Sequence, residues 1–191
     1  MTEAGPGRRL AGKAALVTGA GRRRGLGFAI AARLAAEGAR VVLSDLAERA
    51  GELEDGAARI RAQGGEAAAL CADITSEPEV DALFARAVET AGRLDVLVNN
   101  AGVIVTKLVV DTSLAEWRRC LEVMGAGTFL CCRRAVAVMA RQGSGGRIVN
   151  ISSIMSVSTV PGQTALTVMP RCATSRASVS VRPMTPNFAK V

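Results

Sequence analysis

KAALVTGAGRRRGLG, residues 13–27, sets the fold class of this 191-residue chain. Its first six residues are a short apolar run that ends at a glycine, which is typical of a buried parallel strand leading into a tight turn. Gly19, Gly25 and Gly27 allow the turn, let a phosphate approach the backbone and leave the positive end of the next helix open. The motif alone is weak, because an ordinary glycine-rich turn has the same composition.

Strand-like and helix-like patterns alternate along the rest of the chain. The strand patterns lie at residues 13–18, 40–44, 66–72, 94–98 and 147–151, and the helical patterns lie at 28–37, 46–63, 76–91 and 114–141. This alternation predicts an α/β fold with a doubly wound parallel sheet, Rossmann-like and truncated after the fifth strand. We expect a flexible N-terminus over residues 1–11, a dinucleotide-binding domain over 12–165 and an irregular or disordered tail over 166–191.

Two missing residue types narrow the chemistry. The chain contains no His and no Tyr. Catalysis by Ser-His-Asp or Cys-His groups and His-ligated metal sites are therefore excluded, and no phenol is present. The five cysteines show no Cys-x-x-Cys pair, so we expect no metal. There is no signal-like segment and no run of 18 apolar residues, so we expect a cytoplasmic chain without a membrane span.

The net charge of +7 suggests nucleic acid, but its distribution argues against that partner. Residues 1–165 carry 20 bases and 17 acids, and the other four bases lie in residues 166–191 without an acid. Aromatic residues make up only 3% of the chain, which leaves few platforms for stacking bases. We expect no nucleic-acid partner. The alternative is a basic interaction protein, which salt-dependent binding to DNA would distinguish.

Polar groups at the ends of three predicted strands give the glycine loop its context. Asp45 closes the second strand, 18 residues after Gly27, where a carboxylate can accept both ribose hydroxyls of a dinucleotide. Asp73 and Ile74 end the third strand, where they can meet an adenine. Either aspartate could instead cap the helix that follows. Residues 99–102 (NNAG) follow the fourth strand, where amides can tie strand ends together and small residues leave room for ribose.

Together with Ser152 and Ser153 at the end of the fifth strand, these motifs resemble the short-chain dehydrogenase/reductase family over about residues 12–165. The resemblance implies NAD(P)-dependent hydride transfer with a small-molecule alcohol or ketone. Family members usually form homo-oligomers, which we do not expect of this chain because the matching region ends early. The resemblance does not identify the substrate, because family members recognise their substrates with loops beyond the matching region. The implied cofactor residues are Gly19, Gly25, Leu26 and Gly27 at the phosphates, Asp45 at the ribose, Asp73 and Ile74 at the adenine, and Asn99, Ala101 and Gly102 at the strand-end ribose.

The choice between NAD and NADP depends on the loop and on Asp45. The family usually has three residues between the first two motif glycines, whereas five lie between Gly19 and Gly25. The arginines at 22–24 could hold a 2′-phosphate and favour NADP, but Asp45 would repel one. We expect NAD, with NADP as the alternative, because an arginine side chain can swing into solvent.

The catalytic residues implied by the resemblance are mostly missing. The family uses a tyrosine as acid/base, a lysine that lowers the pKa of that tyrosine, a serine that positions the carbonyl and an asparagine in the preceding helix. Ser153 matches the serine, but Leu166, Pro170 and Met124 occupy the tyrosine, lysine and asparagine positions. We expect a catalytically impaired chain or a non-catalytic dinucleotide-binding remnant.

The resemblance breaks abruptly after Ala165, which favours a frameshift over gradual divergence. Residues 166–171 (LTVMPR) can be encoded as CTT ACG GTC ATG CCA AGG, and reading two bases later gives Tyr-Gly-His-Ala-Lys. That reading restores a tyrosine and a lysine at the family's spacing. Without the catalytic half, we expect Ile148, Val149 and Ile151 to lie on an open edge and the chain to be marginally stable.

Overall fold

Five parallel strands form one sheet in the part of the chain that the computed structural model describes, residues 8–152. The strands are β1 (Ala14–Thr18), β2 (Arg40–Asp45), β3 (Glu66–Cys71), β4 (Val96–Asn99) and β5 (Arg147–Asn150). Their order in the sheet is β3-β2-β1-β4-β5. The chain therefore adds β2 and β3 on one side of β1, crosses over, and adds β4 and β5 on the other side of β1. The predicted doubly wound sheet is confirmed, and every predicted strand is found within two residues of its expected bounds.

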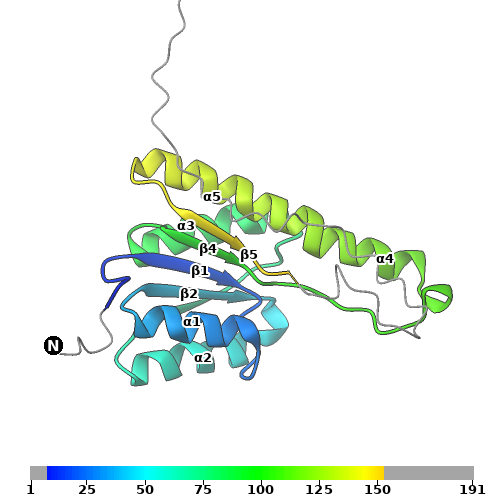
Figure 1. Ribbon diagram of the computed structural model, residues 1–191, viewed down its shortest axis with the longest axis horizontal. Helices are drawn as coiled ribbons and strands as arrows, with labels where there is room; N and C mark the ends of the chain where they lie inside the picture. The colour runs from blue at the N-terminus through cyan, green and yellow to red at the C-terminus, as the bar shows by residue number, and fades with distance from the viewer. Residues whose placement is uncertain (1–7, 153–191) are drawn as a thin grey trace, which may run out of the picture.

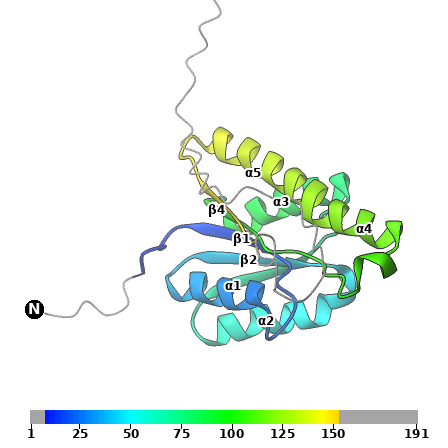
Figure 2. The same cartoon turned by 45° about the vertical axis from the view of Figure 1, so that its right-hand side comes forward.

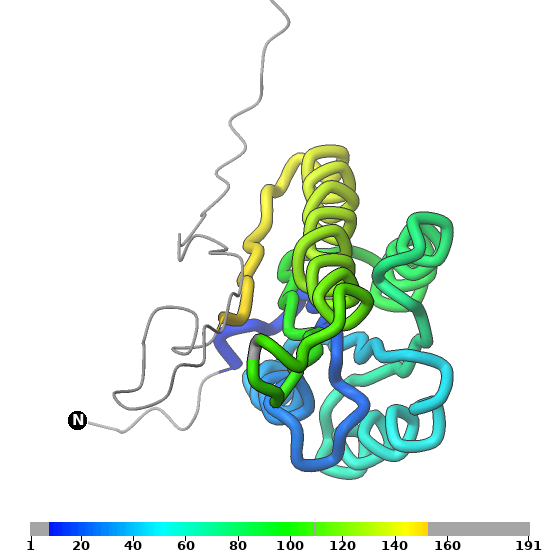
Figure 3. The backbone as a smooth tube through the Cα atoms, turned by 90° about the vertical axis from the view of Figure 1, so that its right-hand side faces the viewer, coloured from blue at the N-terminus to red at the C-terminus, as the bar shows by residue number. Residues whose placement is uncertain are grey.

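Helices cover both faces of this sheet. The described helical elements are α1 (Leu26–Ala36), η1 (Ala47–Arg49), α2 (Ala50–Ala62), α3 (Glu77–Ala91), η2 (Val109–Asp111), α4 (Leu114–Leu121), η3 (Glu122–Gly127) and α5 (Thr128–Gln142). The views agree that α1 and α2 lie on one face, and that α3 and α5 lie on the other (Figure 1, Figure 2 and Figure 3). The predicted helix over 46–63 is divided, because a 3-10 turn, η1, precedes α2.

Each face of the sheet has its own apolar layer. Leu16 and Val42 pack with Phe84 of α3, whereas Val17 and Leu43 pack with the layer under α1 and α2. Successive residues of a strand point to opposite faces, so a strand that is covered on both sides has to be apolar throughout. This explains why continuous apolar runs, not alternating ones, mark the buried strands of this chain.

The predicted helix over 114–141 is interrupted. A capping box at Ser113 and Glu116 starts α4, and the segment Glu122–Gly127 then follows a wider π-helical path before α5 begins. At the end of this segment the backbone passes so close to Ile74 that a Cβ atom at Gly127 would lie 2.8 Å from its side chain. Among the described residues, Leu114–Gln142 is long and apolar enough to cross a membrane, a criterion that a helix packed on a protein core also meets.

The edge strand β5 is only partly covered. Val149 is 46% exposed and Ile151 is 37% exposed, whereas Ile148 packs against the layer under α3 and α5. Within the described residues β5 is an edge strand, and the missing cover is confined to the face of Val149 and Ile151, because α5 lies over the face of Ile148.

Candidate functional site

The strand order reverses between β1 and β4, and Thr18 joins the two strands at their carboxyl ends. Its Oγ1 accepts hydrogen bonds from the main-chain N–H groups of Asn100 and Ala101, at 3.1 and 3.2 Å. The same hydroxyl donates to the carbonyl of Val98 at 3.4 Å. Beyond this point the loops that follow β1 and β4 diverge to opposite faces of the sheet. In open α/β sheets, ligands bind in the crevice at such a point of reversal.

The glycine loop turns at Gly19, which has a φ of +65°. Besides this left-handed conformation, which favours glycine, the position lacks space, because a Cβ atom there would lie 2.6 Å from Ala101 Cα. The side chain of Asn100 holds the turn by donating through Nδ2 to the carbonyls of Thr18 at 3.0 Å and Gly19 at 2.9 Å. The loop thus presents bare backbone at the carboxyl end of β1.

Helix α1 starts against this loop. A Cβ atom at Gly27 would lie 2.5 Å from the Gly19 carbonyl oxygen and 2.5 Å from Asn100 Nδ2. The helix begins at Leu26, with Gly25 as N-cap, no capping side chain and no acidic residue in its first turn. An uncapped helix N-terminus carries a partial positive charge and N–H groups suited to an anion. Gly19 therefore lies against Gly27, while Gly25 and Leu26 begin the same helix, and their contact with phosphates stays a prediction.

Asp45 lies at the end of β2, beside the glycine loop. Its Oδ2 accepts from the Gly21 N–H at 2.7 Å, and its Oδ1 accepts from the Leu46 N–H at 2.9 Å. The alternative of a helix cap is not what the structure shows, since Leu46 is the N-cap of η1. The carboxylate therefore lies directly beside the glycine loop, and its contact with a ribose stays a prediction.

Asp73 holds the turn that precedes α3, whose N-cap is Ser76. Its Oδ1 accepts from the N–H of Thr75 at 2.9 Å and from the Thr75 hydroxyl at 2.7 Å, and Oδ2 lies 3.8 Å from Arg119. Burial raises the pKa of the Asp73 carboxyl, but the two Thr75 hydrogen bonds and the Arg119 charge outweigh it and hold that pKa below its usual value. The next residue, Ile74, is buried. Their contact with adenine stays a prediction.

Asn99 differs from its neighbour in what it touches. It is only 5% exposed, and its Nδ2 donates to Asn150 Oδ1 at 2.8 Å across the β4–β5 pair. Nδ2 also lies 3.2 Å from Cys132 Sγ. Among the described residues the Oδ1 of Asn99 is buried without a hydrogen-bond partner. Asn99 thus ties the sheet together, whereas Asn100 braces the cradle.

Thr18 and Gly21 make hydrogen bonds that shape the site, but the motifs gave neither of them a role. Asn100 was included only as one of the amides of NNAG that tie strand ends together, and not as the residue that holds the glycine loop. The two adjacent asparagines of NNAG indicated that one amide could bind the strand on one side and the other amide the glycine loop on the other side. Gly21 could have been found because it is a fourth glycine in a loop whose motif requires only Gly19, Gly25 and Gly27.

Of the positions that match the family's catalytic residues, the structure describes Met124 alone. It lies in η3, and its Cγ and Sδ are 3.9 Å from where a Cβ atom of Gly102 would be. A thioether therefore faces the NNAG end of the crevice, where the family has an amide. Ser153, Leu166 and Pro170 lie outside the described residues.

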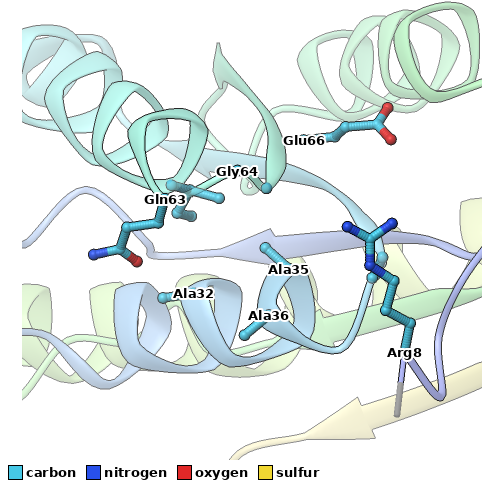
Figure 4. A pocket seen from close by; sticks show the side chains of 11 residues that line it. Arg8, Ala32, Ala35, Ala36, Gln63, Gly64 and Glu66 are labelled. Atoms are coloured by element: carbon cyan, nitrogen blue, oxygen red, sulfur yellow. The ribbon is translucent and has the colours of Figure 1, made fainter. Parts of the chain in front are cut away.

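Other groups in residues 8–152 offer little reactive chemistry. No cluster of three or more Cys, Asp or Glu side chains there is placed to hold a metal ion. Burial, and secondarily the neighbouring Cys132, raises the pKa of Cys131 to about 12, which leaves that thiol protonated and inert. A hollow of about 220 Å³ opens near the amino-terminal ends of β2 and β3, away from the glycine loop. Small residues such as Ala32 and Ala36 line it between Arg8 and Glu66 (Figure 4).

This arrangement is a Rossmann-like α/β fold, and comparison with known proteins gives its family. The family model described as short chain dehydrogenase matches residues 13–167. The chain therefore belongs to the short-chain dehydrogenase family, whose members bind NAD(P).

Individual relatives agree with this assignment. A short-chain dehydrogenase/reductase of Armillaria gallica is 42% identical over 142 residues, which cover 74% of this chain and 54% of the relative. A 3-oxoacyl-[acyl-carrier-protein] reductase of Synechocystis is 39% identical over 154 residues, or 81% of this chain and 61% of the relative. The crystal structure of a short chain dehydrogenase from Mycobacterium smegmatis matches with a TM-score of 0.76 at 38% identity, covering 84% of this chain and 66% of that one. The chain thus spans between half and two thirds of the length of these relatives.

Proposed function

We propose that this chain binds NAD at the carboxyl edge of β1, β2 and β4. The observation that carries the proposal is the cradle of Gly19 and Gly27, where an added Cβ atom would meet main-chain atoms at 2.6 and 2.5 Å. Because neither position has room for a Cβ atom, the glycine loop packs directly against the start of α1 and the residues after β4. The N–H groups of the loop and of α1 can then face one pyrophosphate. This packing supports the proposal that the loop and α1 hold the diphosphate of a dinucleotide.

The adenosine end supports NAD over NADP. The Asp45 carboxylate stands at the end of β2 next to the loop, where it can accept the ribose hydroxyls. A 2′-phosphate at the same place would bring a charge of about −1.5 to −2 against it. The arginines at 22–24 are exposed, and each can point into solvent without losing a contact that the structure describes. NADP is the second candidate because those arginines lie on the same loop.

The reaction that fits this family is hydride transfer to or from a small alcohol or ketone. Bound nicotinamide would supply the hydride chemistry, while the protein binds, orients and handles the proton. In this chain Gly19, Gly27 and Asp45 would hold the cofactor, Asn100 would brace the loop, and Ser153 would position the carbonyl.

We further propose that this chain does not complete that reaction. Proton transfer needs a group that titrates near the working pH, and the family's phenol has no counterpart because the sequence has no Tyr and no His. Met124 cannot donate a hydrogen bond to a water in place of an asparagine. A dinucleotide-binding chain without turnover is the function that these residues support best.

Calorimetric titration of the purified chain with NAD and NADP tests the proposal. We expect both to be bound at the same single site, with NAD bound more tightly. Absence of binding by either would refute the proposed function, and salt-dependent binding to duplex DNA would then favour a basic interaction protein. Tighter binding of NADP, abolished when the arginines at 22–24 are neutralised, would reverse the cofactor assignment.

A further inference from the structure

Gly21 and Asp45 meet where the glycine loop passes the end of β2. The Gly21 N–H donates to Asp45 Oδ2 at 2.7 Å, and the Leu46 N–H donates to Oδ1 at 2.9 Å. One residue earlier, the Ala20 N–H donates to the carbonyl of Ser44 at 3.0 Å. The loop therefore continues the pairing of β1 with β2 past the end of β1. As a result, each oxygen of the carboxylate is held by its own main-chain donor.

There is no room for a side chain beside this carboxylate. A Cβ atom at position 21 would lie 2.9 Å from Asp45 Oδ2, 3.1 Å from Asp45 Cβ and 3.1 Å from Arg49 Cβ. Arg49 is held in turn, because it ends η1 and its guanidinium pairs with Glu52 at 2.9 Å. Any larger residue at position 21 has to displace either the carboxylate or the loop.

The extra length of the loop is accommodated after Gly21. The Gly25 N–H donates to the carbonyl of Arg22 at 2.8 Å, which closes a tight turn around the arginines at 22–24. All three of these arginines are exposed. The arginines therefore occupy a turn that faces solvent, while Gly21 keeps the first half of the loop against Asp45.

We propose that Gly21 is a specificity-determining residue: its N–H fixes the Asp45 carboxylate so that the carboxylate accepts the ribose diol of NAD and excludes a 2′-phosphate. This inference rests on the proposed function. An ionised carboxylate offers about four lone-pair sites. The donors on Gly21 and Leu46 occupy one on each oxygen, which leaves about two for the two hydroxyls of the ribose. A phosphate would face a charge that cannot turn away without breaking both hydrogen bonds.

A double-mutant cycle on the full chain tests this role, with the Kd values of NAD and NADP measured by calorimetry. We expect Gly21→Ala to lower the preference for NAD by about tenfold, which corresponds to about 1.4 kcal/mol. In an Asp45→Ala background, Gly21→Ala should leave the preference unchanged, because the carboxylate it displaces is gone. Gly51→Ala is the matched control, since Gly51 lies on α2 with nothing within 4 Å of its Cβ position. An unchanged preference in Gly21→Ala, or an equal loss in both backgrounds, overturns the role of Gly21.

Amide exchange measured by NMR on the cofactor-free chain tests the contact itself. We expect the Gly21 amide to exchange slowly in the wild type and quickly in Asp45→Ala, while the Ala20 amide stays protected by Ser44 in both. A fast Gly21 amide in a wild-type chain that still prefers NAD overturns this inference and leaves the proposed function standing. A protected Gly21 amide in a chain that binds neither dinucleotide refutes the proposed function, and the specificity role with it.

Discussion

Gly27 at the start of α1 lies directly against Asn100 at the end of β4. A Cβ atom at position 27 would be 2.5 Å from Asn100 Nδ2, the same atom that donates to the carbonyls of Thr18 and Gly19. One amide group therefore joins the end of β1, the start of α1 and the end of β4. The cradle for a diphosphate depends on this three-way contact as much as on the glycines themselves.

Replacing Gly27 with alanine should damage both the fold and the site. The added methyl group has to push apart the Gly19 carbonyl and the Asn100 amide, and overpacking of this kind costs about 1–3 kcal/mol. We expect a lower midpoint in urea denaturation and at least about tenfold weaker NAD binding, since 1.4 kcal/mol corresponds to tenfold. Gly51→Ala, on an open position of α2, should leave NAD binding unchanged and should not lower the urea midpoint, since alanine favours a helix over glycine. If Gly27→Ala is as stable as the wild type, the Gly19 carbonyl and the Asn100 amide can move apart without loss of stability, and the prediction is wrong.

Substitutions of Asn100 should separate its hydrogen bonds from its shape. Asn100→Ala removes two hydrogen bonds to main-chain carbonyls and should destabilise the chain by about 1–3 kcal/mol. Asn100→Asp keeps the shape but places a carboxylate against two carbonyl oxygens, so it should be the more damaging change. Urea denaturation of both variants at pH 7 measures this order. If Asn100→Asp is as stable as the wild type, the amide does not brace the loop.

The ion cluster around Asp95 should make stability depend on pH. Burial raises the pKa of the Asp95 carboxyl, but hydrogen bonds from Arg93, the Ala14 N–H and Lys13 outweigh it and hold that pKa below its usual value. A depressed pKa in the folded state stabilises the chain above the unfolded pKa of about 3.9, and this contribution is lost as the pH falls through the folded value. Asp95→Ala also leaves the buried Ala14 N–H without its acceptor, so we expect a loss of about 2 kcal/mol at pH 7.

Urea denaturation at pH 7 and at pH 3 measures this pH dependence. The difference between the wild type and Asp95→Ala should be smaller at pH 3, because that pH lies below the unfolded pKa of about 3.9 and the stabilisation from the depressed folded pKa is no longer complete there. A difference that is equal at both pH values would show that the charge of Asp95 adds nothing to its hydrogen bonds.

Dehydrogenase turnover should be below about a thousandth of that of an intact family member, because positioned acid–base groups contribute about 10²–10⁴-fold. Met124→Asn should not restore it, since the phenol is still missing. The assay follows NADH with a panel of ketones and alcohols. Robust turnover that disappears in Ser153→Ala would contradict the expectation and show a functioning site around that serine.

The element order was predictable because each strand is a short apolar run and each helix has its own period. The bounds were less predictable where packing decides them. Residues 122–127 lie inside one continuous helical pattern despite Gly125 and Gly127, yet the backbone widens there, where Gly127 packs closely against Ile74 from another part of the chain. A local pattern contains no information about such a contact, so the sequence predicted one uninterrupted helix.

The amino-acid sequence by itself determined the doubly wound sheet, the glycine cradle and the carboxylate at the end of β2, because each follows from local periodicity or from a residue type that the backbone requires. It also determined that no phenol is available for catalysis. Only the tertiary structure decided how these parts are held. Asn100 reaches Gly27, and Gly21 reaches Asp45, across gaps of 73 and 24 positions that close when parallel strands align their carboxyl ends. Hydrogen bonds between such distant segments depend on strand register and helix placement, which are properties of the packed sheet and not of any one motif.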